Sequence, residues 1–138
     1  MSGYLLDTNV LSELLKRRPE PKVIQRLQGI SDPELFTSVV CVMELRFGAA
    51  RVRDGKSLWR RITAEVLSRI QILPLRSHEA TRAGDILADL ERRGEIVGIE
   101  DILIAATAIS RNLTVSTRNT GHFSRIRGLR VEDWWASP

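Results

Sequence analysis

Short runs of apolar residues alternate along this chain with longer stretches in which apolar residues recur every three or four positions. Short apolar runs are typical of buried strands, and the wider spacing is typical of helices that bury one face. Strands that alternate with helices predict an α/β fold, in which a mostly parallel sheet is covered on both sides. The predicted strands cover residues 4–6, 35–37, 72–75, 113–117 and 129–132, and the predicted helices begin near residues 10, 21, 39, 57, 77 and 99, the fourth running to about residue 70.

Polar residues mark the break between the first strand and the first helix. Asp7, Thr8 and Asn9 directly follow the strand, and these residue types prefer turns and helix caps over strand interiors. In an open α/β sheet, ligands bind where strand ends meet helix N-termini. Asp7 therefore either lines a ligand site or simply caps the first helix, and one acid cannot decide between the two.

Two further acidic residues interrupt apolar stripes on predicted helices. Val40, Met43 and Phe47 share one helix face by their spacing, and we expect this face to be buried. Glu44 falls within that face, and Asp101 precedes apolar residues at i+3, i+4 and i+7. Because carboxylates are rarely buried unless they are paired or bind a metal ion, both acids are candidate site residues.

Each of these acids also has a structural explanation. Glu44 can pair with an arginine, and Asp101 lies in a first helical turn, where the helix dipole favours anions. Asp7, Glu44 and Asp101 nevertheless all lie at or shortly after strand-to-helix junctions, so we expect them to face one crevice. Converging carboxylates repel one another until protons or cations relieve the repulsion. With two histidines and one cysteine in the chain, the donor types favour oxygen-bound Mg²⁺ or Mn²⁺ over zinc.

Composition indicates one soluble globular domain, which we assign to residues 1–138. Hydrophobic residues make up 43% of the chain and charged residues 28%, as in ordinary globular proteins. The uncharged runs are too short to cross a membrane, no secretory signal is visible, and the single cysteine suits a reducing compartment, so we expect a cytoplasmic protein. A net charge of +4 beside an acidic pocket favours a polyanionic substrate, and therefore phosphodiester chemistry.

Four segments of the chain resemble, in order and spacing, the motifs of the PIN-domain ribonucleases, and most closely those of VapC toxins of the FitB-like branch. The resemblance extends from Tyr4 to about Trp134. Each motif alone is weak, whereas the four in order are specific. They read Leu5-Leu6-Asp7-Thr8-Asn9-Val10-Leu11-Ser12-Glu13-Leu14, Met43-Glu44-Leu45-Arg46-Phe47-Gly48, Asp101-Ile102-Leu103-Ile104-Ala105-Ala106-Thr107-Ala108 and Ser116-Thr117-Arg118-Asn119.

The resemblance implies a PIN-like three-layer α/β/α fold and an endoribonuclease that uses Mg²⁺ or Mn²⁺ to hydrolyse RNA. It also implies a cognate antitoxin protein that inhibits the enzyme, and a homodimer. Carried over by position, Asp7, Glu44 and Asp101 are the catalytic and metal-binding acids. The residues expected to line the same pocket are Thr8, Asn9, Thr117, Asn119 and His122, and the possible phosphate contacts are Arg46 and Arg118.

The chain departs from the family pattern at one position. Many members carry a fourth acid after the Thr-Arg-Asn segment, and His122 stands there in this sequence. A histidine is neutral or positive near pH 7 and does not attract a second cation as a carboxylate does. We therefore expect a single metal ion, with His122 either assisting cleavage or lying in a surface turn.

Functions of other classes compete with the nuclease hypothesis. A phosphoacceptor receiver domain also has an acidic Mg²⁺ pocket, but it needs a lysine after a late strand, and Lys16, Lys22 and Lys56 all lie early in the chain. A non-catalytic nucleic-acid-binding or scaffold protein on the same fold stays open, as does a nuclease that acts on DNA. Three intact acids favour the enzyme over the scaffold.

Overall fold

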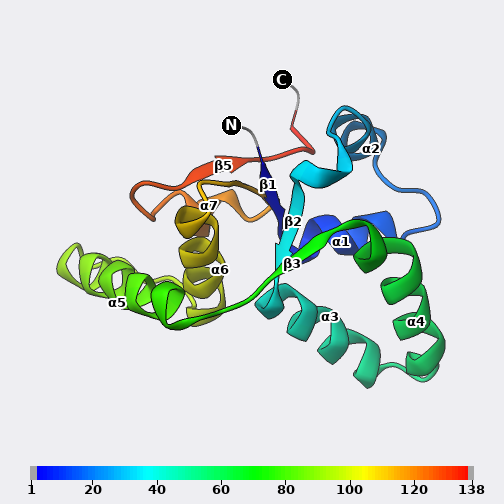
Figure 1. The fold of residues 1–138 in the computed structure, drawn as a ribbon, viewed down its shortest axis with the longest axis horizontal. Helices are drawn as coiled ribbons and strands as arrows, with labels where there is room; N and C mark the ends of the chain where they lie inside the picture. Colours follow the sequence, from blue (N-terminus) through cyan, green and yellow to red (C-terminus); the bar gives the residue numbers. More distant parts are fainter. Residues whose placement is uncertain (1–2, 137–138) are drawn as a thin grey trace.

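A five-stranded parallel sheet lies at the centre of the computed structural model, which describes residues 3–136 (Figure 1). The strand order is β3-β2-β1-β4-β5, and each neighbouring pair is parallel. The sheet confirms the predicted α/β class. Its strands are β1 (Tyr4–Leu6), β2 (Leu35–Ser38), β3 (Gln71–Leu73), β4 (Thr114–Ser116) and β5 (Arg130–Glu132).

Helices cover both faces of the sheet and make the predicted three layers. The chain moves outward from β1 to β3, then returns past β1 to β4 and β5, so right-handed crossovers put the two sets of helices on opposite faces. In Figure 1, α5 and α6 lie to the left of the sheet, whereas α1, α3 and α4 lie to the right. Across residues 3–136, no helix combines the length and apolar character that crossing a membrane requires. The helices are α1 (Thr8–Leu14), α2 (Pro21–Gln28), α3 (Val39–Arg51), α4 (Gly55–Arg61), α5 (Ser77–Arg92), α6 (Ile99–Ser110) and α7 (Thr120–Phe123).

The core forms where β1 passes between the two helical layers. Leu5 and Leu6 are both fully buried, because a central parallel strand is covered on each face and needs apolar residues at successive positions. On α6, Ile104 and Ala105 are also fully buried. The most apolar predicted helix is therefore the one packed most deeply, and it holds Asp101 in its first turn beside the sheet.

Two predicted segments differ in detail from the structure. The helix expected over residues 57–70 begins earlier as α4, then widens into a π-helical segment (Ile62–Val66) and tightens into a 3-10 turn (Leu67–Arg69). These changes of winding keep Ile62, Val66 and Leu67 buried. The strand expected over 72–75 ends at Leu73, since the proline that follows has no N–H for the ladder.

Our expectation that Val40, Met43 and Phe47 on α3 form a buried face is wrong for Met43 and Phe47, whereas Val40 is buried. Met43 is 54% exposed and Phe47 is 60% exposed. The helix instead buries Cys41, Leu45 and Ala49, which are spaced four residues apart. Both sets of residues have helical spacing, so the periodicity alone cannot say which of them meets the core.

Candidate active site

Asp7 stands at the point where the chain reverses its direction across the sheet. β1 lies between β2 and β4, and the backbone N–H of Asp7 donates to Ser116 O (3.0 Å), which joins the ends of β1 and β4. Such a reversal opens a crevice beyond the carboxyl ends of the strands. The Asp7 side chain caps α1 by accepting a hydrogen bond from Thr8 N at 2.8 Å, and its other oxygen accepts from Thr117 Oγ1 at 2.7 Å. Capping and lining the crevice are therefore compatible roles.

Asn9 connects this carboxylate to the loop after β4. Its amide Nδ2 lies 3.2 Å from Thr117 Oγ1 and 3.4 Å from Asp7 Oδ2. Its Oδ1 accepts a hydrogen bond from the backbone N–H of Arg118 at 3.1 Å, and Thr117 Oγ1 accepts one from Asn119 N at 2.9 Å. The polar residues after β1 and those after β4 thus form one network, which fixes the Asp7 side chain.

Glu44 reaches the same place from α3. Thr8 Oγ1 donates to Glu44 Oε1 at 2.6 Å, so the hydroxyl links the first turn of α1 to the middle of α3. Ligand atoms of Asp7, Cys41 and Glu44 all lie within 4.8 Å of one another. Burial raises the pKa of the Cys41 thiol, which keeps it protonated and weak as a ligand. The carboxylate oxygens of Asp7 and Glu44 are the donors here that suit an oxygen-preferring cation such as Mg²⁺ or Mn²⁺.

Burial makes the Asp7 charge costly. The pKa of Asp7 is raised to about 6, first by desolvation and further by the Asp101 and Glu44 carboxylates. The hydrogen bonds from Thr117 and Thr8 oppose the rise without cancelling it. A buried carboxylate that faces other carboxylates is stabilised by a nearby cation, so the donor set fits a divalent metal ion.

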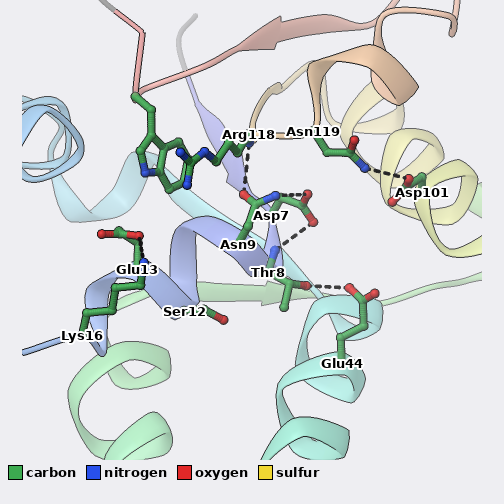
Figure 2. Close-up of a pocket in the computed structure, with 11 residues that line it drawn as sticks. Asp7, Thr8, Asn9, Ser12, Glu13, Lys16, Glu44, Asp101, Arg118 and Asn119 are labelled. Atoms are coloured by element: carbon green, nitrogen blue, oxygen red, sulfur yellow. Dashed lines mark hydrogen bonds and ion pairs between the residues drawn. The ribbon is translucent and has the colours of Figure 1, made fainter. Parts of the chain in front are cut away.

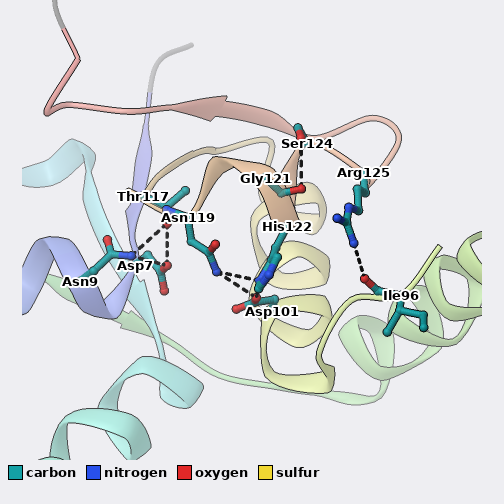
Figure 3. A network of polar contacts seen from close by, with 10 residues as sticks. All are labelled: Asp7, Asn9, Ile96, Asp101, Thr117, Asn119, Gly121, His122, Ser124 and Arg125. Atoms are coloured by element: carbon teal, nitrogen blue, oxygen red, sulfur yellow. Dashed lines mark hydrogen bonds and ion pairs between the residues drawn. The ribbon is translucent and has the colours of Figure 1, made fainter.

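Asp101 is held by a second set of contacts at the start of α6. Its Oδ2 lies 3.1 Å from His122 Nδ1 and 3.5 Å from Asn119 Nδ2 (Figure 3). Asn119 Nδ2 and His122 Nδ1 are themselves 2.8 Å apart. His122 therefore contacts a site acid directly and lies on the short helix α7, with its side chain 49% exposed. Neither His122 nor Thr117, which we also expected in the pocket, is among the residues that line it.

One pocket of about 480 Å³ contains the three predicted acids (Figure 2). Figure 2 shows Glu13 and Lys16 on one side of this pocket and Asp101 on the other. The ammonium group of Lys16 lies 2.9 Å from Glu13 Oε1, and it holds the pKa of this buried acid below its usual range. The lining residues are Asp7, Thr8, Asn9, Ser12, Glu13, Lys16, Glu44, Asp101, Arg118, Asn119 and Trp135.

The two predicted phosphate contacts have different surroundings. Arg118 lines the pocket, whereas the Arg46 guanidinium lies 5.1 Å from the centre of the Trp59 ring and borders a separate hollow near residues 49–56. The structure therefore does not support Arg46 as a pocket residue. Sequence reasoning did not single out Ser12, Glu13, Lys16 or Trp135 for this pocket. Ser12 and Glu13 stand inside the first motif, and the signal for Trp135 was its place in a pair of tryptophans that can anchor the chain or stack on bases.

Comparison with known proteins decides the family. The family model described as "PIN domain" matches residues 4–129, almost the whole chain. The chain belongs to the PIN-domain family. The tRNA(fMet)-specific endonuclease VapC of Shigella flexneri is 36% identical over 134 residues, which are 97% of this chain and 99% of that protein. Toxin FitB of Neisseria gonorrhoeae is 36% identical over 124 residues, or 86% of this chain and 89% of its own.

Solved structures of the family agree with this PIN domain in shape as well. A chain in the crystal structure of DNA-bound VapBC from Salmonella typhimurium superposes with a TM-score of 0.88 at 33% identity. The match covers 97% of this chain and 99% of that chain. Agreement over both full lengths confirms the predicted resemblance and the three-layer fold.

Proposed function

We propose that this PIN domain is a metal-dependent endoribonuclease and the toxin of a toxin–antitoxin pair. One observation carries the proposal: carboxylates from three separate elements line a single pocket at the reversal point of the sheet. Related proteins of similar length are named as a tRNA-specific endonuclease and as a toxin, which supports RNA as the substrate class. The family resemblance adds a cognate antitoxin and a homodimer to the proposal.

Asp7, Glu44 and Asp101 would hold the metal ion: ligand atoms of Asp7 and Glu44 lie within 4.8 Å of each other, and Asp101 lines the same pocket. Mg²⁺ and Mn²⁺ both accept all-oxygen surroundings and leave room for water and a substrate phosphate. Such an ion supplies a water ligand of lowered pKa and offsets charge on the phosphoryl oxygens. The proposal requires no nucleophilic side chain, which agrees with a pocket lined mainly by acids and their hydrogen-bond donors.

The remaining side chains position the acids and attract the substrate. The hydroxyls of Thr117 and Thr8 donate to Asp7 and Glu44 and so hold each carboxylate in one orientation. Arg118 and Lys16 bring positive charge to the same pocket, where a phosphodiester chain must approach three acids. His122 contacts Asp101, and we expect a single metal ion to suffice, because no fourth acid stands at that position.

Cleavage assays with a matched pair of variants test the nuclease. We expect purified protein to cut single-stranded RNA with Mg²⁺ or Mn²⁺ and to lose this activity in excess EDTA. Glu44→Gln should lower the rate more than about 100-fold, since metal-ion catalysis contributes several kcal/mol. Glu65→Gln is the control, because Glu65 lies on the surface and pairs with Arg61.

Three outcomes would contradict the nuclease proposal. Cleavage that persists in EDTA would contradict the metal-dependent mechanism. Equal activity of the Glu44→Gln and Glu65→Gln variants would contradict the assignment of the active site. A single-stranded DNA of the same sequence, cut faster than the RNA, would make the protein a DNA nuclease.

Growth assays test the toxin role separately. Expression of the wild-type chain alone should arrest growth, whereas expression of Asp7→Asn should not. Co-expression of a cognate antitoxin, to be sought in the reading frames beside the gene, should restore growth. Arrest that is equally strong with Asp7→Asn would show that toxicity does not come from cleavage.

A further inference from the structure

Two consecutive tryptophans near the end of the chain have different environments. Trp134 is 1% exposed and packs in the core, whereas Trp135 is partly exposed and lines the acidic pocket. A residue that only anchors the chain has no reason to border a charged pocket. The difference suggests that the second tryptophan has a role of its own.

Trp134 holds this segment of the chain in place. Its ring makes an edge contact with Tyr4 on β1, with 5.6 Å between the ring centres, and its Nε1 donates to Glu132 Oε1 at 3.2 Å. The backbone N–H of Trp135 donates to Asp133 Oδ1 at 2.9 Å. The anchor and the turn together fix where the backbone of Trp135 lies, and its side chain packs in part against the core and also lines the pocket.

Arg118 completes this side of the pocket. Its guanidinium lies 5.2 Å from the centre of the Trp135 ring, at cation–π distance. Its backbone is tied to Asn9 Oδ1, and Asn9 in turn contacts Asp7. The flat Arg118–Trp135 pair is therefore held at a fixed position relative to the metal-binding acids.

A nucleotide offers the two groups that this pocket can receive. Its phosphate is anionic, which suits the cation expected at Asp7 and Glu44 and the positive charge of Arg118 and Lys16. Its base is a flat ring, and aromatic and guanidinium planes both stack on bases. A base inside a duplex has both faces covered, so the pair can reach only an unpaired base.

We propose that Arg118 and Trp135 form a stacking site for an unpaired RNA base next to the scissile phosphate. This inference rests on the proposed ribonuclease function and adds to it how the substrate is held. Such a site favours single-stranded or loop RNA over duplex. Stacking accepts any base, so the site selects for unpaired structure more than for sequence.

The chain contains an internal control for this inference. Arg46 and Trp59 make a similar pair, with 5.1 Å between the guanidinium and the ring centre, but Trp59 is absent from the lining of the acidic pocket. A cation–π pair on a surface is common and is no site by itself. Of these two pairs, the Arg118–Trp135 pair borders the acids, so substitutions at the two tryptophans should have different effects.

The first test measures RNA binding without cleavage. In EDTA and in the Glu44→Gln background, we expect Trp135→Leu to weaken binding of a short single-stranded RNA about tenfold, in the range that base–aromatic stacking contributes. Trp135→Phe keeps an aromatic face, so its affinity for the RNA should fall about threefold or less. Trp59→Leu should bind as the background protein does. Equal losses for Trp135→Leu and Trp59→Leu, or no loss for Trp135→Leu, would overturn the proposal.

A double-deletion experiment then separates stacking from anchoring. An abasic nucleotide is placed at each RNA position in turn, and binding is measured with Trp135 present and with Trp135→Leu. At one RNA position, removal of the base should weaken binding about tenfold when Trp135 is present. The same removal should have almost no effect in Trp135→Leu, because the base and the ring contribute a single shared interaction. If Trp135 only anchors the chain, the abasic profile keeps its shape and the melting temperature falls instead, which would overturn the stacking site.

The two proposals can fail independently. If the wild type cleaves RNA while Trp135→Leu binds and cleaves like the wild type, the stacking site is wrong and the nuclease stands. If no RNA is cleaved under any metal condition but Trp135→Leu still loses affinity at one base, the proposed function is wrong and the base site stands as a binding site.

Discussion

The two ends of the acidic pocket hold their carboxylates in different ways. Asp7 is 5% exposed, and each of its oxygens accepts a hydrogen bond from a neighbouring residue of the network, Thr8 or Thr117. Asp101 has a side chain that is 20% exposed, and it contacts His122, whose own side chain is 49% exposed. One acid is fixed by the interior, and the other is held at the surface by residues that solvent also reaches.

This difference shows where charge is costly in the protein. Burial is the largest cause of the raised pKa of Asp7, and the other two acids add to it. Water solvates and screens the charge of a partly exposed acid such as Asp101, so its ionised form costs less free energy. The need for a cation is therefore greatest at the Asp7 end, where Glu44 also lies, and the substitutions below should affect the two ends unequally.

The largest expected effect is on catalysis, and it should be common to both ends. We expect Asp7→Asn and Asp101→Asn each to lower RNA cleavage more than about 100-fold, because each removes a charge that faces the metal and the phosphate. Asp85→Asn, an exposed acid on α5, is the control for a simple change of charge. An Asp101→Asn variant with wild-type activity would restrict the chemistry to the Asp7 end.

Substitutions at the two ends should have different effects on the free energy of unfolding. In metal-free protein at pH 7.5, Asp7→Asn should raise the free energy of unfolding by up to about 3 kcal/mol, the equivalent of a pKa shift from 3.8 to about 6. The asparagine accepts weaker hydrogen bonds from Thr117 and Thr8 than the carboxylate does, which reduces this gain. Urea unfolding should therefore show an increase of about 1–3 kcal/mol in the free energy of unfolding. Asp101→Asn should change it by less than about 0.5 kcal/mol. Equal effects of the two substitutions would refute the comparison.

The pH dependence of stability follows with a definite sign. Because folding raises the pKa of Asp7, the folded state keeps a proton that the unfolded state releases between about pH 4 and pH 6. The wild type should therefore lose stability relative to Asp7→Asn as the pH rises through this window, and the difference should be constant above it. A difference between the two proteins that stays flat from pH 4 to pH 7 would show that the Asp7 charge is not costly.

Metal addition should restore the lost stability at the same end. A ligand that binds only the folded state stabilises it by about 2.7 kcal/mol at one hundred times its Kd. Mn²⁺ or Mg²⁺ should therefore raise the melting temperature of the wild type and of Asp85→Asn, but raise that of Asp7→Asn little. If Asp7→Asn responds as the wild type does, the cation binds elsewhere.

The smallest effect is expected at His122, which supports the exposed end. His122→Ala should lower cleavage by roughly 10- to 100-fold or less, since a positioned acid–base group contributes about 10²- to 10⁴-fold and the help is only partial here. Asp101 also loses one of its two contacts in this variant. His122→Asp should raise metal affinity or stoichiometry in titration calorimetry by adding a carboxylate. His78→Ala is the matched control, since His78 is exposed on α5. Two equally tight metal ions in the wild type would contradict the role expected of this histidine.

Local sequence determined the element order and the places where the acids stand. The apolar runs and the polar residues Asp7, Thr8 and Asn9 specify a strand that ends and a helix that begins, because each preference acts within a few residues. Asp101 follows in the same way from the first turn of an apolar helix. The sequence alone therefore predicted the fold class and a crevice lined by these acids.

Only the tertiary structure decided which of two equivalent helix faces meets the core and which distant side chains share the pocket. On α3, the set with Met43 and the set with Leu45 both have helical spacing, and packing buried the second. Arg46 and Arg118 look alike in sequence, yet one stacks on Trp59 and the other lines the pocket with Trp135. Periodicity describes one element at a time, whereas these outcomes depend on contacts between segments far apart in the chain, and so they appear only when the elements pack.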